Sequence, residues 1–96
     1  MACQVLLEAT IKDGCHDKLR EKFVELLPAT RGFDGCIYLY ITKDQDNPAQ
    51  IIIVELWESR AHYEKYLAWR TETGVMDELA TMIDNPSWRF LDNWGV

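Results

Sequence analysis

The residues with the clearest chemical potential lie where a very apolar segment, Ile51 to Val54, gives way to aromatic and charged side chains. Glu55 and Trp57 are two residues apart, so on a strand they point to the same face. A carboxyl buried on that face must be paired or have a raised pKa, and in the second case it could act as a general base. Trp57 could plug the core or form the wall of a pocket, and we expect packing with pocket lining as an added role.

Three further candidates follow on the next predicted helix. Tyr63, Tyr66 and Arg70 recur at three- and four-residue spacing, which places them on one helical stripe facing the sheet. A buried tyrosine hydroxyl needs a hydrogen-bond partner or a ligand. The guanidinium of Arg70 could form an ion pair with Glu55 or Glu8, the interpretation that we favour. Alternatively, it could hold an anionic or phenolate oxygen through its planar donor fork.

Tyr38 and Tyr40 are substrate-binding candidates on an earlier predicted strand. With regular alternation, Cys36, Tyr38 and Tyr40 share one face, and three aliphatic residues share the other. The tyrosine face could line a cavity or a dimer interface, and the pattern leaves both readings open.

The remaining reactive side chains are expected to play no chemical role. His16 and His62 are expected at the surface. Cys3, Cys15 and Cys36 are far apart and lack metal-ligand spacing, so we expect reduced thiols and no metal site. The sequence also carries no flavin or nicotinamide motif, and we expect no cofactor.

Composition bounds the class of protein. The 96 residues are 48% hydrophobic and predict one folded domain, spanning residues 1–96. A net charge of −6 disfavours nucleic acid and anionic membranes as partners, because the overall field repels phosphate. The first residues lack a basic region ahead of an apolar run, so no signal peptide is predicted and we expect a cytoplasmic protein.

Apolar periodicity and turn residues predict a β-α-β-β-α-(α)-β order. This is the α+β, ferredoxin-like split βαβ plan, with an antiparallel four-stranded sheet and its helices on one face. Pro28 is expected to end the first helix, and Ser59 to cap the second. The predicted strands are 4–12, 36–41, 51–58 and 87–94, and the predicted helices are 16–27, 61–71 and a short one near 75–83.

The second and third strands are apolar or aromatic on both faces, whereas a one-sided antiparallel strand would alternate with polar residues. Helices cover only one face, and a chain of this length has nothing left to cover the other. We therefore expect a homodimer formed through the two sheets.

Two segments, GFDGCIYLYITKDQDNP (32–48) and VELWESRAHYEKYLAWR (54–70), together with the terminal strand, resemble the antibiotic biosynthesis monooxygenase superfamily. The resemblance implies a small ferredoxin-like protein that dimerises through its sheets into an α/β barrel, with a cavity between sheet and helices. Some members oxidise polycyclic quinols or anthrones with O₂ and no cofactor.

The resemblance also carries site residues onto this chain. Trp57 and Tyr63 match a tryptophan and a tyrosine that line the site in the quinol-oxidising members, whereas Ile53 stands in place of their asparagine. Leu67 stands where haem-degrading relatives have an iron-binding histidine, so haem is not expected. Tyr66 replaces a histidine common in other members.

The function expected from these observations is a cofactor-independent monooxygenase acting on a small aromatic, quinol- or anthrone-like molecule. The alternatives are a non-catalytic dimer that binds a small hydrophobic ligand, and an isomerase or cyclase acting on a polyketide-like ring. The expected catalytic residues are Trp57, Tyr63 and Arg70, and the expected substrate-binding residues are Tyr38, Tyr40, Glu55 and Tyr66.

Overall fold

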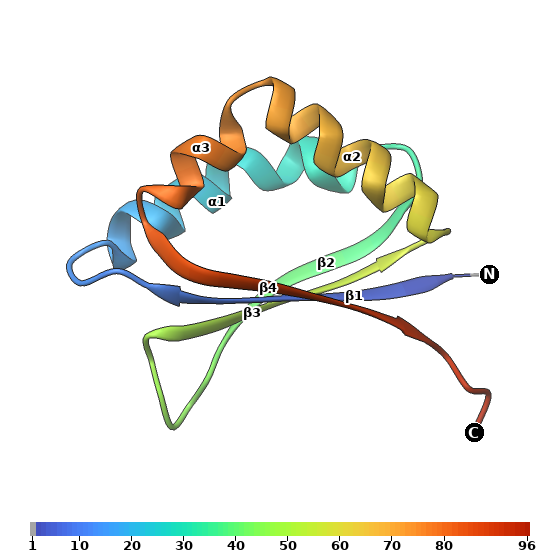
Figure 1. Cartoon of the computed structure of the whole chain (residues 1–96), viewed down its shortest axis with the longest axis horizontal. Helices are drawn as coiled ribbons and strands as arrows, with labels where there is room; N and C mark the ends of the chain where they lie inside the picture. The colour runs from blue at the N-terminus through green and yellow to red at the C-terminus, as the bar shows by residue number, and fades with distance from the viewer. Residues whose placement is uncertain (1) are drawn as a thin grey trace.

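A computed structural model describes residues 2–96 as a four-stranded sheet with three helices on one face (Figure 1). Within these residues, no helix has the length and apolar character needed to cross a lipid bilayer. The elements are β1 (Cys3–Ile11), α1 (His16–Arg31), β2 (Cys36–Lys43), β3 (Gln50–Trp57), α2 (Arg60–Glu72), α3 (Val75–Ala80) and β4 (Ile83–Asp92).

The strand order is β2-β3-β1-β4, and every neighbouring pair is antiparallel. This order confirms the predicted ferredoxin-like fold. The two central strands, β1 and β3, are adjacent although a helix and a strand separate them in the sequence. The sheet therefore brings the start of β1 beside the end of β3, where Cys3 pairs with Trp57.

Alternate residues of the central strands are buried beneath the helices. On β3 these are Ile51, Ile53, Glu55 and Trp57, so a carboxyl group lies in an otherwise apolar row. Among residues 2–96 no second layer covers the other face of the sheet, and there Tyr40 is 59% exposed (Figure 1).

The sequence predicted that the first helix would end before Pro28. In the structure α1 continues through Pro28 to Arg31. Proline removes only the hydrogen bond to the carbonyl of Val24, whose side chain lies in an exposed part of the helix. The last turn is anchored elsewhere. The hydroxyl of Thr30 donates to the carbonyl of Leu26, and the guanidinium of Arg31 donates to the carbonyl of Leu39.

The strand β4 begins at Ile83, four residues earlier than expected. The third helix, expected near 75–83, accordingly ends at Ala80. Asn85 adopts a positive φ of 53° at an irregularity in the pairing with β1. An edge strand tolerates Pro86 because its missing N–H removes no hydrogen bond that a central strand would need. The ladder ends at Asp92, so Trp94 lies beyond it and is exposed.

Candidate active site

Glu55 is the buried carboxyl group of the core, with 2% of its surface exposed. Its Oε1 accepts a hydrogen bond of 3.1 Å from the indole Nε1 of Trp57. Among the described residues no cation forms a salt bridge with it. Burial raises the pKa of Glu55 from 4.5 to about 7, and the Trp57 hydrogen bond opposes this rise. The carboxyl group is therefore poised to exchange a proton near neutral pH.

The ring of Trp57, which donates to this carboxyl group, packs against two tyrosine rings. The ring centroid of Trp57 lies 5.6 Å from that of Tyr63 and 5.0 Å from that of Tyr66. The side chain of Ser59 accepts a hydrogen bond from the backbone N–H of His62, confirming the predicted cap of α2. The helix thus starts directly after β3 and places its tyrosines over the end of that strand.

The hydroxyl group of Tyr63 is positioned as a hydrogen-bond donor. Its oxygen accepts a bond of 2.8 Å from the indole Nε1 of Trp88, and the described residues offer its own hydrogen no acceptor. Burial, together with the charge of Glu55, raises the pKa of Tyr63, so the phenol stays protonated. A substrate oxygen could therefore take the hydrogen that Tyr63 has available.

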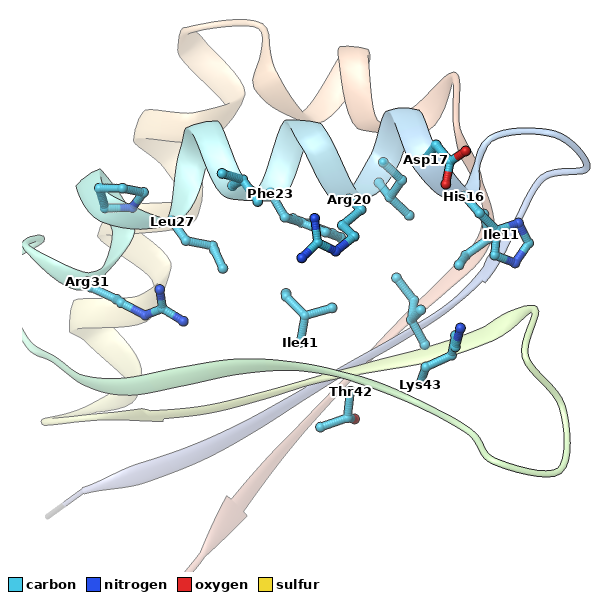
Figure 2. A pocket seen from close by; sticks show the side chains of 14 residues that line it. Ile11, His16, Asp17, Arg20, Phe23, Leu27, Arg31, Ile41, Thr42 and Lys43 are labelled. Carbon is cyan, nitrogen blue, oxygen red and sulfur yellow. The ribbon is translucent and has the colours of Figure 1, made fainter.

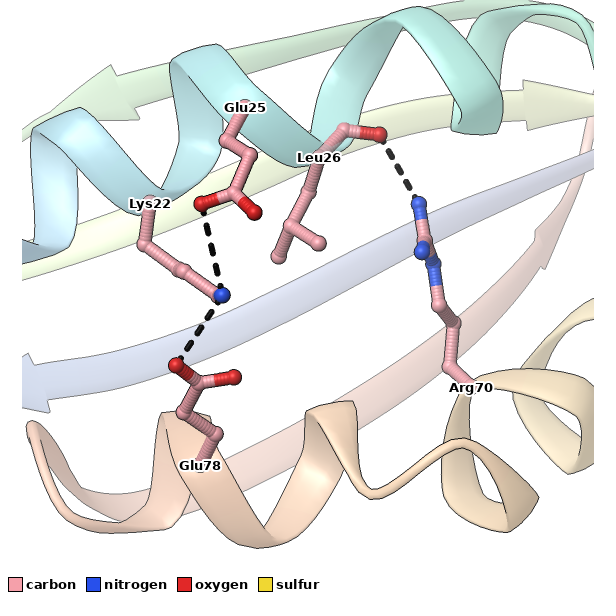
Figure 3. A network of polar contacts seen from close by, with 5 residues as sticks. All are labelled: Lys22, Glu25, Leu26, Arg70 and Glu78. Carbon is pink, nitrogen blue, oxygen red and sulfur yellow. Dashed lines mark hydrogen bonds and ion pairs between the residues drawn. The ribbon is translucent and has the colours of Figure 1, made fainter.

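Arg70 belongs to a polar network between α2 and α1. Its Nε donates to the hydroxyl of Tyr66 at 3.0 Å, and its Nη2 donates to the hydroxyl of Thr30 at 2.9 Å. The same Nη2 donates to the carbonyl of Leu26 at 2.8 Å, as Figure 3 shows. The hydroxyls of Thr30 and Tyr66 are 2.7 Å apart. This network fixes the orientation of Tyr66.

The favoured ion pair between Arg70 and a glutamate of the sheet is therefore wrong. The donors of Arg70 named above reach neutral oxygens of α1 and α2. Glu8 points to the open face of the sheet and pairs with Arg89. Farther along the same gap between α1 and the other two helices, Lys22 binds Glu25 at 3.4 Å and Glu78 at 2.9 Å, which joins α1 to α3 (Figure 3).

A small cavity lies between the sheet and the helices, with a volume of about 50 Å³. Its polar lining consists of Glu55, Tyr63, Tyr66, Arg70 and Thr30. A space of this size admits water or O₂ but no aromatic ring, because benzene occupies a cavity of about 150 Å³. Trp57 is fully buried behind the cavity and does not line it. Its position is that of a packing residue that also holds Glu55.

A much larger groove, of about 590 Å³, lies between α1 and the edge formed by β2 (Figure 2). Its volume falls within the range of ligand sites, roughly 300–1,000 Å³. Phe23, Leu27 and Ile41 line both the groove and the small cavity. One layer of apolar side chains therefore separates the open groove from the chamber that contains Glu55.

Tyr38 and Tyr40 lie on the open face of the sheet, away from the other site candidates. The hydroxyl of Tyr38 donates to Oε1 of Gln4 at 3.1 Å, and the two tyrosine rings are 5.6 Å apart. The expectation that Cys36 shares their face is wrong. An irregularity between Cys36 and Tyr38 interrupts the alternation, and Cys36 packs into the core beside Trp57.

The histidines and cysteines contribute little to this site. His16 is exposed, and burial raises the pKa of the Cys3 and Cys36 thiols, which disfavours the reactive thiolate. His62 Nε2 lies 3.6 Å from a carboxylate oxygen of Glu58 and 3.9 Å from one of Asp34. These three residues are the set among residues 2–96 with ligand atoms close enough to hold a cation, but the acidic partners are exposed.

The sequence interpretation missed two groups of residues. Thr30 is fully buried and completes the Arg70 network. Arg20 and Arg31 border the groove, and the sequence interpretation gave neither of them a role. The signal was available in their spacing with Leu27, since residues 20, 27 and 31 fall on one side of a helix.

Fold and site together define a small ferredoxin-like protein with an acid-containing aromatic cavity beneath its helices. The family model of the antibiotic biosynthesis monooxygenases matches residues 4–71, and the chain belongs to that family. Among curated proteins, none matches the sequence significantly.

Solved structures share this fold at low sequence identity. One is a protein of Deinococcus radiodurans assigned provisionally to the antibiotic biosynthesis monooxygenases, with a TM-score of 0.84, 21% identity and coverage of 100% of this chain and 95% of that one. A conserved protein of Methanosarcina mazei has a TM-score of 0.88 at 15% identity, covering 97% and 93% of the two chains. A further antibiotic biosynthesis monooxygenase has a TM-score of 0.83 at 21% identity, with 95% and 97% covered.

Proposed function

We propose that this protein is a monooxygenase that oxidises a small aromatic, quinol- or anthrone-like substrate with O₂ and without a cofactor, and that Glu55 is its general base. The observation that carries the proposal is the buried carboxyl of Glu55, which faces the cavity and has a pKa raised to about 7. A base with a pKa near the working pH is effective in proton abstraction. Membership of the family makes oxidation the reaction to test first.

The chemistry can be written with the substrate as the source of all the electrons. A substrate ring reaches Glu55 only when the wall of Phe23, Leu27 and Ile41 opens, because the closed cavity is too small for a ring. Glu55 removes a proton from a ring CH₂, and the resulting enolate passes one electron to O₂. The two radicals combine to form a C–O bond, and the peroxide takes the proton back from Glu55. Glu55 then removes the second proton of the same carbon while the O–O bond breaks. The ring carbon becomes C=O, and the departing hydroxide takes that proton and leaves as water.

The neighbouring residues would assist this reaction by position. Tyr63 would donate its available hydrogen to the developing enolate oxygen, which stabilises charge where it forms. Arg70 would act as a positioning residue, because it fixes Tyr66 and the cavity wall through the network with α1. The apolar wall would keep competing water away from the reduced oxygen species.

A second function uses the same groups without O₂. Glu55 as base and Tyr63 as acid lie on one cavity, and this pairing also suits an isomerase or cyclase acting on a ring ketone. Oxygen dependence separates the two proposals, since only the monooxygenase consumes O₂. Binding without any turnover would indicate the non-catalytic module.

The test is O₂ uptake with a panel of anthrones and hydroquinones, in the presence of a metal chelator. We expect Glu55→Gln to lower the rate by about 100-fold or more, since general-base catalysis contributes roughly that much. Tyr63→Phe and Trp57→Phe should lower it less. The matched control is Glu58→Gln, whose carboxyl is exposed. The wild-type rate should rise with pH and level off above about 7, as Glu55 loses its proton.

A Glu55→Gln variant that keeps the wild-type rate would overturn the assignment of the base. Product formed at an unchanged rate under nitrogen would move the function to the isomerase or cyclase.

A further inference from the structure

The groove between α1 and the β2 edge has an apolar floor and a charged rim. The floor is formed mainly by Leu19, Phe23, Leu27, Ile41 and Ile51. Figure 2 shows Ile41 pointing up toward the helix, whereas Thr42 points away from the groove. This arrangement suits a ligand with a flat apolar body that lies against the sheet edge.

The rim is cationic, although the whole chain has a net charge of −6. Arg20, Arg31 and Lys43 border the groove, against the single carboxylate of Asp17. Arg20 and Lys43 form no ion pair within the described part of the chain. Figure 2 shows the guanidinium groups of Arg20 and Arg31 extending into the space over the floor. A positive rim in an acidic protein favours an anionic ligand through charge complementarity.

We propose that this groove binds an aromatic carboxylate of one or two rings. The planar guanidinium groups of Arg20 and Arg31 match the geometry of a carboxylate, which can accept two parallel hydrogen bonds. The rings lie on Phe23, Leu27 and Ile41. The ligand needs only one charged group, because the rest of the groove lining is largely apolar.

The groove also connects this ligand to the buried acid. Phe23, Leu27 and Ile41 form its shared wall with the cavity of Glu55, so a bound ring lies one side chain away from the proposed base. Because Phe23 belongs to this shared wall, a ring in the groove could reach Glu55 only if the Phe23 side chain moved. The idea that this aromatic carboxylate is also the substrate rests on the proposed function. Its binding in the groove does not depend on that function.

The experiment compares 2-naphthoate with the neutral 2-naphthalenemethanol on the whole protein. Affinity is measured by isothermal titration calorimetry, and the site is located by amide chemical-shift changes in two-dimensional NMR. We expect naphthoate to bind more tightly than the alcohol and to shift the amides of α1 and β2. Arg20→Gln should weaken naphthoate binding by roughly tenfold and leave binding of the alcohol unchanged.

Two further variants complete the test. Arg31→Gln should weaken binding similarly, but it also loses a hydrogen bond to the carbonyl of Leu39, so Arg20→Gln is the decisive change. Lys65→Gln, an exposed cation on α2, is the matched control and should bind naphthoate as the wild type does.

Equal affinity for acid and alcohol would overturn the proposal, as would naphthoate shifts on the open sheet face. Amides of α1 beside the groove that shift when the protein alone is diluted would overturn it too, because a second copy would then occupy the groove. Binding needs no O₂. Naphthoate bound in the groove of a protein without oxygenase activity would therefore support this inference while contradicting the proposed function.

Discussion

Glu55 shows how a buried titratable group lowers the stability of a fold. A carboxyl group in an apolar row loses its hydration, and the hydrogen bond from Trp57 replaces only part of it. Tyr63 is placed on the same cavity with a hydrogen to donate. An acid–base pair of this kind is typical of a reactive site, because perturbed pKa values gather where burial and function coincide.

The stability of the protein should therefore depend on the protonation of Glu55. Its pKa rises from 4.5 to about 7 on folding. Between these values the folded state keeps a proton that the unfolded state has lost, so the free energy of unfolding falls as pH rises. At about 1.4 kcal/mol per pKa unit, the total loss above pH 7 is about 3 kcal/mol.

Urea unfolding at pH 5 and pH 8 measures this effect. The glutamine of the Glu55→Gln variant has no proton to lose. From pH 5 to pH 8 the free energy of unfolding of the variant should therefore rise by roughly 2–3 kcal/mol relative to that of the wild type. A constant difference across this range would show that Glu55 is hydrated or paired in solution.

Among the connecting segments, the turn before β2 imposes the tightest constraint on neighbouring elements. Gly35 has a φ of +90°, and its carbonyl accepts a hydrogen bond from the backbone N–H of Glu58 at the end of β3. A Cβ at this position would lie 2.5 Å from the ring and 2.6 Å from the Cβ of His62. The close approach sets how α2 starts over the end of β3.

Gly35→Ala should therefore destabilise the fold by more than about 2 kcal/mol, because left-handed strain adds to a contact that the base of His62 cannot relieve. Gly14→Ala is a matched control. Its φ is also positive, at +77°, but a Cβ there meets no atom within 4 Å. We expect a cost of only about 1 kcal/mol for the control, measured by urea unfolding. Equal costs would contradict a role for the His62 contact.

At the scale of the whole molecule, the sheet is covered on one face only. Leu6 and Val54 pair across β1 and β3 on the open face, and Tyr40 is largely exposed beside them. We propose that a second copy of the chain covers this face, sheet against sheet. Large apolar faces on small proteins mark interaction surfaces, and a self-complementary face closes as a dimer.

Sedimentation or light scattering tests this assembly. The wild type should have the mass of a dimer at micromolar concentration, and Val54→Lys should raise the dissociation constant at least about 100-fold, because a buried unpaired charge costs several kcal/mol. Val24→Lys changes an exposed valine of α1 and should leave the dimer intact. A wild-type protein that is monomeric at about 100 μM would contradict the proposal.

The order of the elements could be predicted from the sequence because it depends on local signals. Ser59 begins α2 as expected, since capping involves only the next few residues. The apolar rows of β1 and β3 follow from alternation, and they led to the correct fold. Glu55 was correctly expected on the face of Trp57 for the same reason.

By itself, then, the sequence determined the fold class and the stripe of Tyr63, Tyr66 and Arg70 that faces the sheet. Only the tertiary structure decided what those side chains meet. Arg70 binds to α1 because oxygens of Leu26 and Thr30 lie within its reach. These residues are 40 or more positions away in the sequence, so the local spacing of residues around Arg70 could not predict the contact. The bulge that turned Cys36 away from the face of Tyr38 and Tyr40 depends on pairing with β3. The groove exists only because α1 packs beside that sheet edge.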